Sequence, residues 1–190
     1  GPLVNPLTHY FDTFEQDQFS VEMQLSGSAI DDRLNWVAGV YAFEEDGENL
    51  NPVDFTTVSL QSGGYFDYSS EAVFAQATFD FTEKLSVTAG MRYTKEDRDY
   101  LPDQYIEEMP LGGLPFPCFN YSDGSLKVCA LGDRVVPYET VNNSISENTP
   151  MASISYSPTD DLMLYATYSE GFKVGGFTQR IFPPEASLPS

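Results

Sequence analysis

The sequence has few of the residues from which catalytic and metal sites are usually built. It contains one histidine, His9, and two cysteines, Cys118 and Cys129, among 190 residues. One histidine supplies neither a catalytic triad with a convincing base nor a histidine cluster, and the cysteine spacing matches no zinc or redox motif. No pair of acidic residues stands out for acid–base chemistry. We therefore expect no enzymatic activity, no catalytic residues, no metal site and no cofactor.

Basic residues are also scarce. The chain has 9 lysines and arginines against 29 aspartates and glutamates, a formal net charge of -20. A chain with this balance repels the phosphate backbone of nucleic acids, so we expect no nucleic-acid partner. The acidic residues gather between the apolar stretches, as in 44–46 and 107–108, which is typical of solvated loops.

Long hydrophobic runs are missing as well. No stretch approaches the roughly 18 apolar residues of a membrane helix, and residues 1–20 lack the basic start and apolar core of a signal peptide. A membrane β-barrel remains compatible with this, because each of its strands carries only about 10 alternating residues. The missing signal also agrees with the expectation that this is an internal piece of a longer protein.

Apolar and polar residues alternate with a period of two along several stretches of the chain. From Ala72 to Tyr93, apolar and polar side chains alternate in two runs that a short break at 82–84 separates. Period two is typical of strands, and two runs joined by a short break predict a hairpin. The same pattern predicts hairpins at about 17–45, 69–97 and 147–173. We therefore expect an all-β fold, an antiparallel up-and-down meander.

The connections between these strands fall into two classes. Short turns join the strands within each hairpin, and long loops at 46–68, 98–146 and 174–190 follow the hairpins. In an up-and-down sheet this order places all short turns at one edge and all long loops at the other. Outer-membrane barrels have this arrangement, with short periplasmic turns and long extracellular loops. A structureless loop of about 50 residues would count against a compact soluble domain.

The two faces of the strands differ in a way that favours a barrel. One face carries small apolar residues such as Ala77 and Ala89 with aromatic residues near the strand ends, and a face against lipid tails has no need of bulky interdigitating residues. Arg92 and Glu22 lie on the other face, because a basic residue at mid-depth in lipid costs about 2–4 kcal/mol. Six strands with open edges do not close in lipid, so we expect a slice of a large transmembrane β-barrel, with outer-membrane lipid as its first partner.

Three stretches, 34–45, 71–99 and 162–177, resemble the barrel domain of TonB-dependent outer-membrane receptors, in the siderophore-receptor-like branch. The likeness covers about 17–99 and 147–177. It rests on the residue patterns of the hairpins and on their order in the chain. It implies a location in the bacterial cell outer membrane, a barrel of about 22 strands and a separate plug domain that fills it. Residues 1–190 would then be a partial barrel domain, with the plug and its TonB-contacting segment absent.

The resemblance also implies a function, which is TonB-energised uptake of a scarce ligand, most directly a ferric siderophore. Haem, vitamin and oligosaccharide receptors share these hairpins. A soluble, secreted all-β module that binds a ligand or carbohydrate is the alternative from another class. The candidates for ligand contact, in the lumen or the loops, are Arg92, Tyr100, Tyr105, Phe119, Tyr121 and Tyr138. Aromatic rings could stack on a planar ligand or sugar, or could instead pack the loops together.

The two cysteines lie in the second long loop. A local disulfide between Cys118 and Cys129 is expected in an oxidising compartment, and in the chain-entropy model it stabilises the loop by about 3 kcal/mol. Two free thiols are the alternative.

Overall fold

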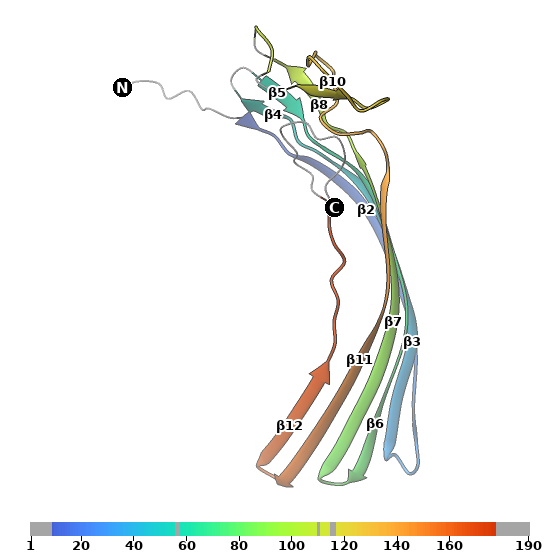
Figure 1. The fold of residues 1–190 in the computed structure, drawn as a ribbon. Helices are drawn as coiled ribbons and strands as arrows, with labels where there is room; N and C mark the ends of the chain where they lie inside the picture. The colour runs from blue at the N-terminus through green and yellow to red at the C-terminus, as the bar shows by residue number, and fades with distance from the viewer. Residues whose placement is uncertain (1–8, 56–57, 110, 115–116, 178–190) are drawn as a thin grey trace, which may run out of the picture.

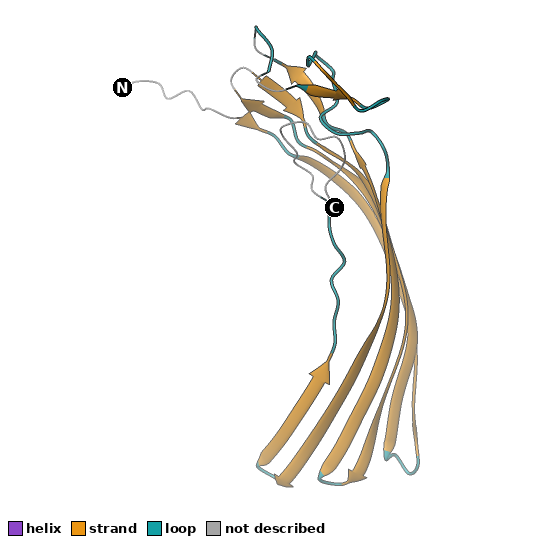
Figure 2. Cartoon of the chain, in the orientation of Figure 1, coloured by secondary structure: helices purple, strands orange, loops and turns teal. Residues whose placement is uncertain are grey.

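The computed structural model describes residues 9–55, 58–109, 111–114 and 117–177 (Figure 1). Throughout these residues the regular structure consists of strands (Figure 2). None of the described residues forms a helix that could cross a membrane.

Six long strands form one antiparallel sheet in the order β2-β3-β6-β7-β11-β12, so each strand pairs with the next long strand in the chain. They are β2 (Thr13–Ala29), β3 (Leu34–Leu50), β6 (Gly63–Thr82), β7 (Leu85–Pro102), β11 (Val141–Thr159) and β12 (Leu162–Ser169). The sheet is strongly curved, with a concave side toward which the chain after β12 turns (Figure 1). This is the predicted up-and-down meander, and it is not closed within the described residues.

The long connections contain strands of their own. The small strands are β1 (His9–Tyr10), β4 (Val53–Phe55), β5 (Val58–Gln61), β8 (Tyr105–Glu108), β9 (Cys118–Asn120) and β10 (Ser125–Lys127). β1, β4, β5 and β8 form a four-stranded sheet, and β9 pairs with β10. We call the described residues of 9–12, 51–62 and 103–140, which contain these six strands, the outer unit. The predicted long loops at 46–68 and 98–146 therefore contain strands, and most of the predicted loop at 174–190 lies outside the described residues.

The long strands also run past the predicted hairpin bounds. For example, β3 reaches Leu50 instead of 45, and β7 reaches Pro102 instead of 97, whereas β12 ends at Ser169, short of 173. The reason is that alternation in hydrophobicity marks only the part of a strand where one face meets an apolar medium. Beyond that part the outward face becomes polar, so the backbone pairing continues without the alternation that marked the hairpins.

The register places the alternating apolar residues on one face. Directly opposed residues share a face of an antiparallel sheet, and the rows run straight across the strands, for example Met23–Val40–Val73–Tyr93. The apolar belt, as we call these rows, comprises Val21, Met23, Leu25, Leu34, Trp36, Ala38, Val40, Ala42, Val73, Ala75, Ala77, Phe79, Leu85, Val87, Ala89, Met91, Tyr93, Ala152, Ile154, Tyr156, Leu164, Ala166 and Tyr168. Large members such as Met23, which is 66% exposed, are uncovered by any other described part of the chain.

The short turns are braced by basic residues. Arg33 donates from Nε and Nη2 to the carbonyl oxygens of Asp80 and Phe81, both at 2.9 Å, and Lys84 Nζ donates to the carbonyl oxygen of Pro158 at 3.0 Å. Arg33 directly precedes β3, and Lys84 directly precedes β7. The side chain of each reaches the next hairpin along the sheet. The three hairpins are therefore linked at the turn edge as well as through their strands.

The assignment of faces can be tested by a pair of neighbouring substitutions in a complete barrel that contains this chain. Ala77 lies in the apolar belt, whereas the Thr78 hydroxyl is 2.8 Å from that of Thr88 on the concave face. We expect Ala77→Arg to reduce membrane insertion by about 2–4 kcal/mol and Thr78→Arg to reduce it far less. Heat-modifiable gel migration of the inserted fraction measures both, and equal losses would contradict the assignment.

Candidate functional site

The concave face of the sheet holds a pocket of about 510 Å³. Strands β3, β6, β7 and β11 form its wall, and residues 170–172, just after β12, close one side. The lining combines aromatic rings, hydroxyl groups and charged groups of both signs. Its principal members are Tyr41, Phe43, Tyr68, Arg92, Arg98 and Phe172.

Arg92 is held over aromatic rings in this pocket. Its guanidinium carbon lies 5.3 Å from the ring centre of Tyr41 and 5.6 Å from that of Phe74, and its Nε donates to Thr94 Oγ1 at 3.2 Å. Each such cation–π contact contributes about 0.5–1 kcal/mol at an exposed site. Among the described residues no carboxylate forms an ion pair with Arg92. It is therefore a positioned cation that has no ion-pair partner among the described residues.

A glycine makes this arrangement possible. Gly39 is directly opposite Phe74, which is directly opposite Arg92. A Cβ at position 39 would lie 2.6 Å from Phe74 Cζ and 2.7 Å from the carbonyl oxygen of Met23. The absence of a side chain at Gly39 leaves room for the Phe74 ring, which Arg92 contacts from the other side of β6.

The second arginine of the pocket is neutralised. Arg98 Nη2 is 3.0 Å from Glu96 Oε2, and its guanidinium carbon is 5.3 Å from the ring centre of Tyr68. Its charge is therefore compensated locally, and it contributes a planar surface more than a free charge.

The upper part of the concave face is packed rather than open. Tyr100 is 1% exposed and stacks on Phe177 with ring centres 5.4 Å apart, and Val174 is 5% exposed. Burial raises the pKa of Tyr100 to about 12. The chain after β12 is thus attached to the sheet through Tyr100, and this tyrosine offers little surface to a ligand.

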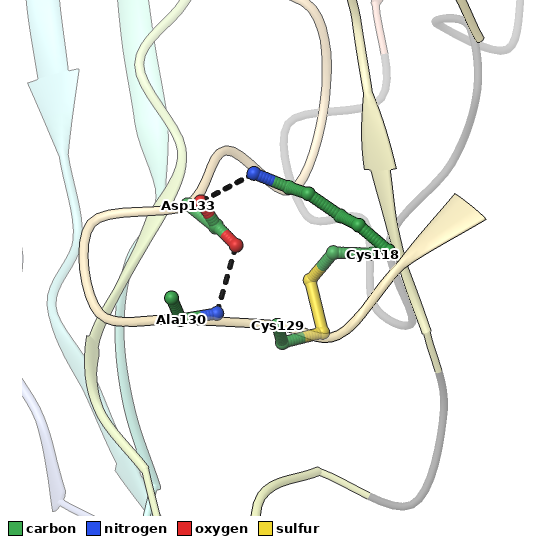
Figure 3. The surroundings of a disulfide bond; sticks show 5 residues. Cys118, Cys129, Ala130 and Asp133 are labelled. Atoms are coloured by element: carbon green, nitrogen blue, oxygen red, sulfur yellow. Dashed lines mark hydrogen bonds and ion pairs between the residues drawn. A yellow bond between two sulfur atoms is a disulfide. The ribbon is translucent and has the colours of Figure 1, made fainter. Parts of the chain in front are cut away.

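The outer unit has its own small core. Leu60, Ile106 and Val135 pack with Cys118 and Cys129, whose sulfur atoms form a disulfide across a Cα–Cα distance of 5.0 Å (Figure 3). Next to it, the Asp133 carboxylate is 2.7 Å from Lys127 Nζ and accepts a hydrogen bond of 2.8 Å from the backbone N–H of Ala130. The disulfide and this carboxylate hold together a segment that is too small for a large core.

Tyr105 and Tyr138 lie around another arginine of the outer unit. The Arg134 guanidinium carbon is 4.2 Å from the ring centre of Tyr138 and 5.6 Å from that of Tyr105, and Arg134 is ion-paired with Asp103. Burial, followed by nearby carboxylates, raises the pKa of Tyr105. These rings therefore pack on an arginine of the same unit, which is one of the two roles that the sequence left open for them.

Phe119 and Tyr121 lie on the hairpin of β9 and β10, with ring centres 6.3 Å apart. The six residues expected to contact a ligand are thus distributed over four places: Arg92 in the pocket, Tyr100 above it, and two separate pairs in the outer unit. Tyr41, Phe74 and Gly39, which position Arg92, were not among them. The sequence held no signal for their meeting, because it depends on the register of three strands.

The outward face above the apolar belt carries rows of acidic residues. Asp17, Asp46, Asp67 and Asp99 are directly opposed across four neighbouring strands. Like charges in directly opposed positions destabilise a sheet, so this row is maintained at a cost in stability. Within the described part of the chain, no group of three or more acidic, histidine or cysteine residues is arranged to hold a metal ion.

Comparison with known proteins agrees with this geometry. A family model described as "TonB dependent receptor-like, beta-barrel" matches residues 4–189. The chain belongs to this family. TonB-dependent receptors are outer-membrane proteins and not enzymes, so the apolar belt faces lipid and the concave side faces the barrel lumen. The family match and the uncovered belt exclude the soluble binding module.

A solved structure shows the same fold. The crystal structure of the ferric yersiniabactin uptake receptor FyuA from Yersinia pestis matches with a TM-score of 0.71 and 15% sequence identity. The match covers 97% of this chain and 25% of that chain, so the present chain spans about a quarter of the receptor's length. A search of curated proteins gives no match.

The disulfide of the outer unit leads to a prediction about stability. Removing it with Cys118→Ala and Cys129→Ala together should destabilise the outer unit by about 3 kcal/mol, because the loop it closes becomes free in the unfolded ensemble. Limited proteolysis of the complete barrel should then cut within residues 111–134 much faster, while the six-stranded sheet stays intact. Reduction of the unsubstituted protein should have the same effect. Unchanged cleavage after both treatments would contradict the stabilising role.

The second prediction concerns alkaline pH. A tyrosine in the unfolded chain ionises near a pKa of 10.0, whereas that of Tyr100 is about 12 in the fold. The stability due to its neutral form is therefore fully present below about pH 10 and is lost as the pH rises toward 12. Denaturant unfolding at pH 8 and pH 11 measures this loss, and Tyr100→Phe should reduce it. An identical pH dependence in wild type and variant would refute the assignment.

Proposed function

We propose that this chain forms part of the lumen wall of a receptor that takes up a ferric siderophore across the outer membrane with energy from TonB. The observation that carries the proposal is Arg92, a cation that two aromatic rings position in the lumen and that has no ion-pair partner in the described part of the chain. An iron chelate with an anionic group and flat rings is complementary to such a surface. The structural neighbour FyuA, a ferric yersiniabactin uptake receptor, supports the same class of ligand.

TonB would act through a plug region. The wall described here would contribute binding surface only, since nothing in residues 9–177 that the structure describes forms a plug across the lumen (Figure 1). The pocket lies on the lumen side of the strands, which is where a ligand captured by the outer unit would pass on its way inward.

Binding of ferric siderophores to cells that carry the complete receptor tests this role. We expect Arg92→Gln to weaken binding by roughly tenfold, which corresponds to about 1.4 kcal/mol for one charged contact, and to slow growth on the same ferric siderophore under iron limitation. Arg98→Gln is the matched control, because Glu96 already compensates that arginine, and it should have a smaller effect.

A panel of ferric siderophores, haem, cobalamin and oligosaccharides identifies the ligand class. Uptake of at least one ferric siderophore that depends on both TonB and Arg92 would support the proposal. Uptake restricted to a ligand without iron, or an equal loss in Arg92→Gln and Arg98→Gln, would refute it.

A further inference from the structure

The chain leaves the sheet after β12 and runs along the concave side (Figure 1). We call residues 170–177 the lumen strap. Gly171 and Phe172 line the pocket that contains Arg92. Farther along, Val174 is 5% exposed. The strap therefore forms one wall of the candidate ligand site without being part of the sheet.

A proline explains where the strap leaves the sheet. The last contact of the ladder is the backbone N–H of Glu170, which donates to the carbonyl oxygen of Pro150 on β11 at 3.0 Å. In an antiparallel ladder a residue directs its N–H and its C=O toward the same neighbouring strand. Proline has no N–H, so Pro150 cannot donate the second hydrogen bond of this pair. The pairing of β11 with β12 ends at this position.

The departure of the strap leaves one edge of β11 open. Residues 141–149 pair with β7 on one side, and no described strand pairs with them on the other. Such an edge presents N–H and C=O groups at the spacing that a further strand requires. Met151 is opposite Ser169, so continuing this register would place the strap opposite residues 143–150.

The continued register is complementary in charge. It places Lys173 opposite Glu147, with both side chains on the concave face. In the present position neither residue forms an ion pair with another described residue. Opposite charges in directly opposed positions stabilise a pair of strands. Phe172 would turn to the outward face in this register, so the pocket would lose that part of its wall.

We propose that the lumen strap alternates between two positions: the position described here, which walls the pocket, and a continuation of β12 along β11, which opens it. The first position is stabilised by the stacking of Phe177 on Tyr100 and by the burial of Val174. The second position gains backbone pairing with β11 and the contact between Lys173 and Glu147. Each position therefore has interactions that the other lacks.

The composition of the strap fits a segment with two paths. It contains three glycines, whose backbones adopt more conformations than those of other residues. A ligand that contacts both Arg92 and Phe172 binds only the walled pocket fully, so it shifts the strap to that position, and it is released when the strap moves away. This role of the pocket rests on the proposed function, whereas the two positions of the strap do not.

Two pairs of cysteines in the complete receptor distinguish the positions. A Cβ at Gly175 would lie 3.6 Å from Asn143 Nδ2, so Gly175→Cys with Asn143→Cys traps the strap on the concave face. The continued register places Gly176 opposite Ser144 on the outward face, so Gly176→Cys with Ser144→Cys traps the added strand. In the present position a Cβ at Gly176 has no described atom within 4 Å. We expect mild oxidation of the ligand-free receptor to form both disulfides, which mass spectrometry of tryptic peptides measures.

A matched control tests the register. Ser146→Cys replaces Ser144→Cys on the same strand and the same face, two residues away. It should cross-link with Gly176→Cys much less than Ser144→Cys does.

Substitutions of charge and of the ring test what stabilises each position. Lys173→Glu should reduce the cross-link between positions 176 and 144 by about threefold, because it replaces an attraction to Glu147 by a repulsion. Combining it with Glu147→Lys should restore the cross-link. Phe177→Ala should increase the same cross-link, because it removes the stacking on Tyr100.

Heat-modifiable migration verifies that each variant forms an intact barrel. Absence of either disulfide, equal cross-linking of positions 144 and 146, or no restoration by the exchange of charges would overturn the proposal. These measurements need no ligand. A receptor that forms both disulfides but takes up no ferric siderophore would therefore support the two positions of the strap and refute only the proposed function.

Discussion

The structure depends on the requirement that backbone N–H and C=O groups in lipid be paired with other protein groups. The long strands satisfy it by continuous antiparallel pairing, which runs from Thr13 opposite Leu50 to Ala29 opposite Leu34 in the first hairpin alone. Because this pairing has no interruption at the level of the membrane, every alternate side chain is committed to one face. The apolar belt and the lumen wall are two consequences of the same ladder.

The lumen site is a product of that register. Cross-strand opposition brings Gly39, Phe74 and Arg92 into one row, and the missing side chain at position 39 leaves room for the ring that supports the guanidinium. The same device occurs on the lipid face, where a Cβ at Gly27 would lie 3.0 Å from the ring of the directly opposed Trp36. On both faces, an aromatic ring thus occupies the space over a directly opposed glycine. Neither face therefore needs a bulky residue on every strand.

Charged residues play different roles at the two ends of the molecule. Below the acidic rows, basic side chains at the turns stabilise the sheet through carbonyl oxygens, as Arg33 and Lys84 do. Above the belt, acidic residues dominate the outward face, and the outer unit depends on covalent and local ionic contacts such as the disulfide and the Lys127–Asp133 pair. The outer unit, whose core consists of a few residues, is therefore the part that carries the cross-link, as expected for a small extracellular segment.

The sequence by itself determined the all-β meander, the position of the short turns and the two faces, since all three follow from a period of two that any strand imposes on its own residues. It held no information on the strands of the outer unit, the polar upper halves of the long strands, or the ring contacts of Arg92 and Arg134. Only the tertiary structure decided these, because a side chain's neighbours across a sheet are set by pairing between strands far apart in the chain, and polar rows carry no alternation from which that pairing could be inferred.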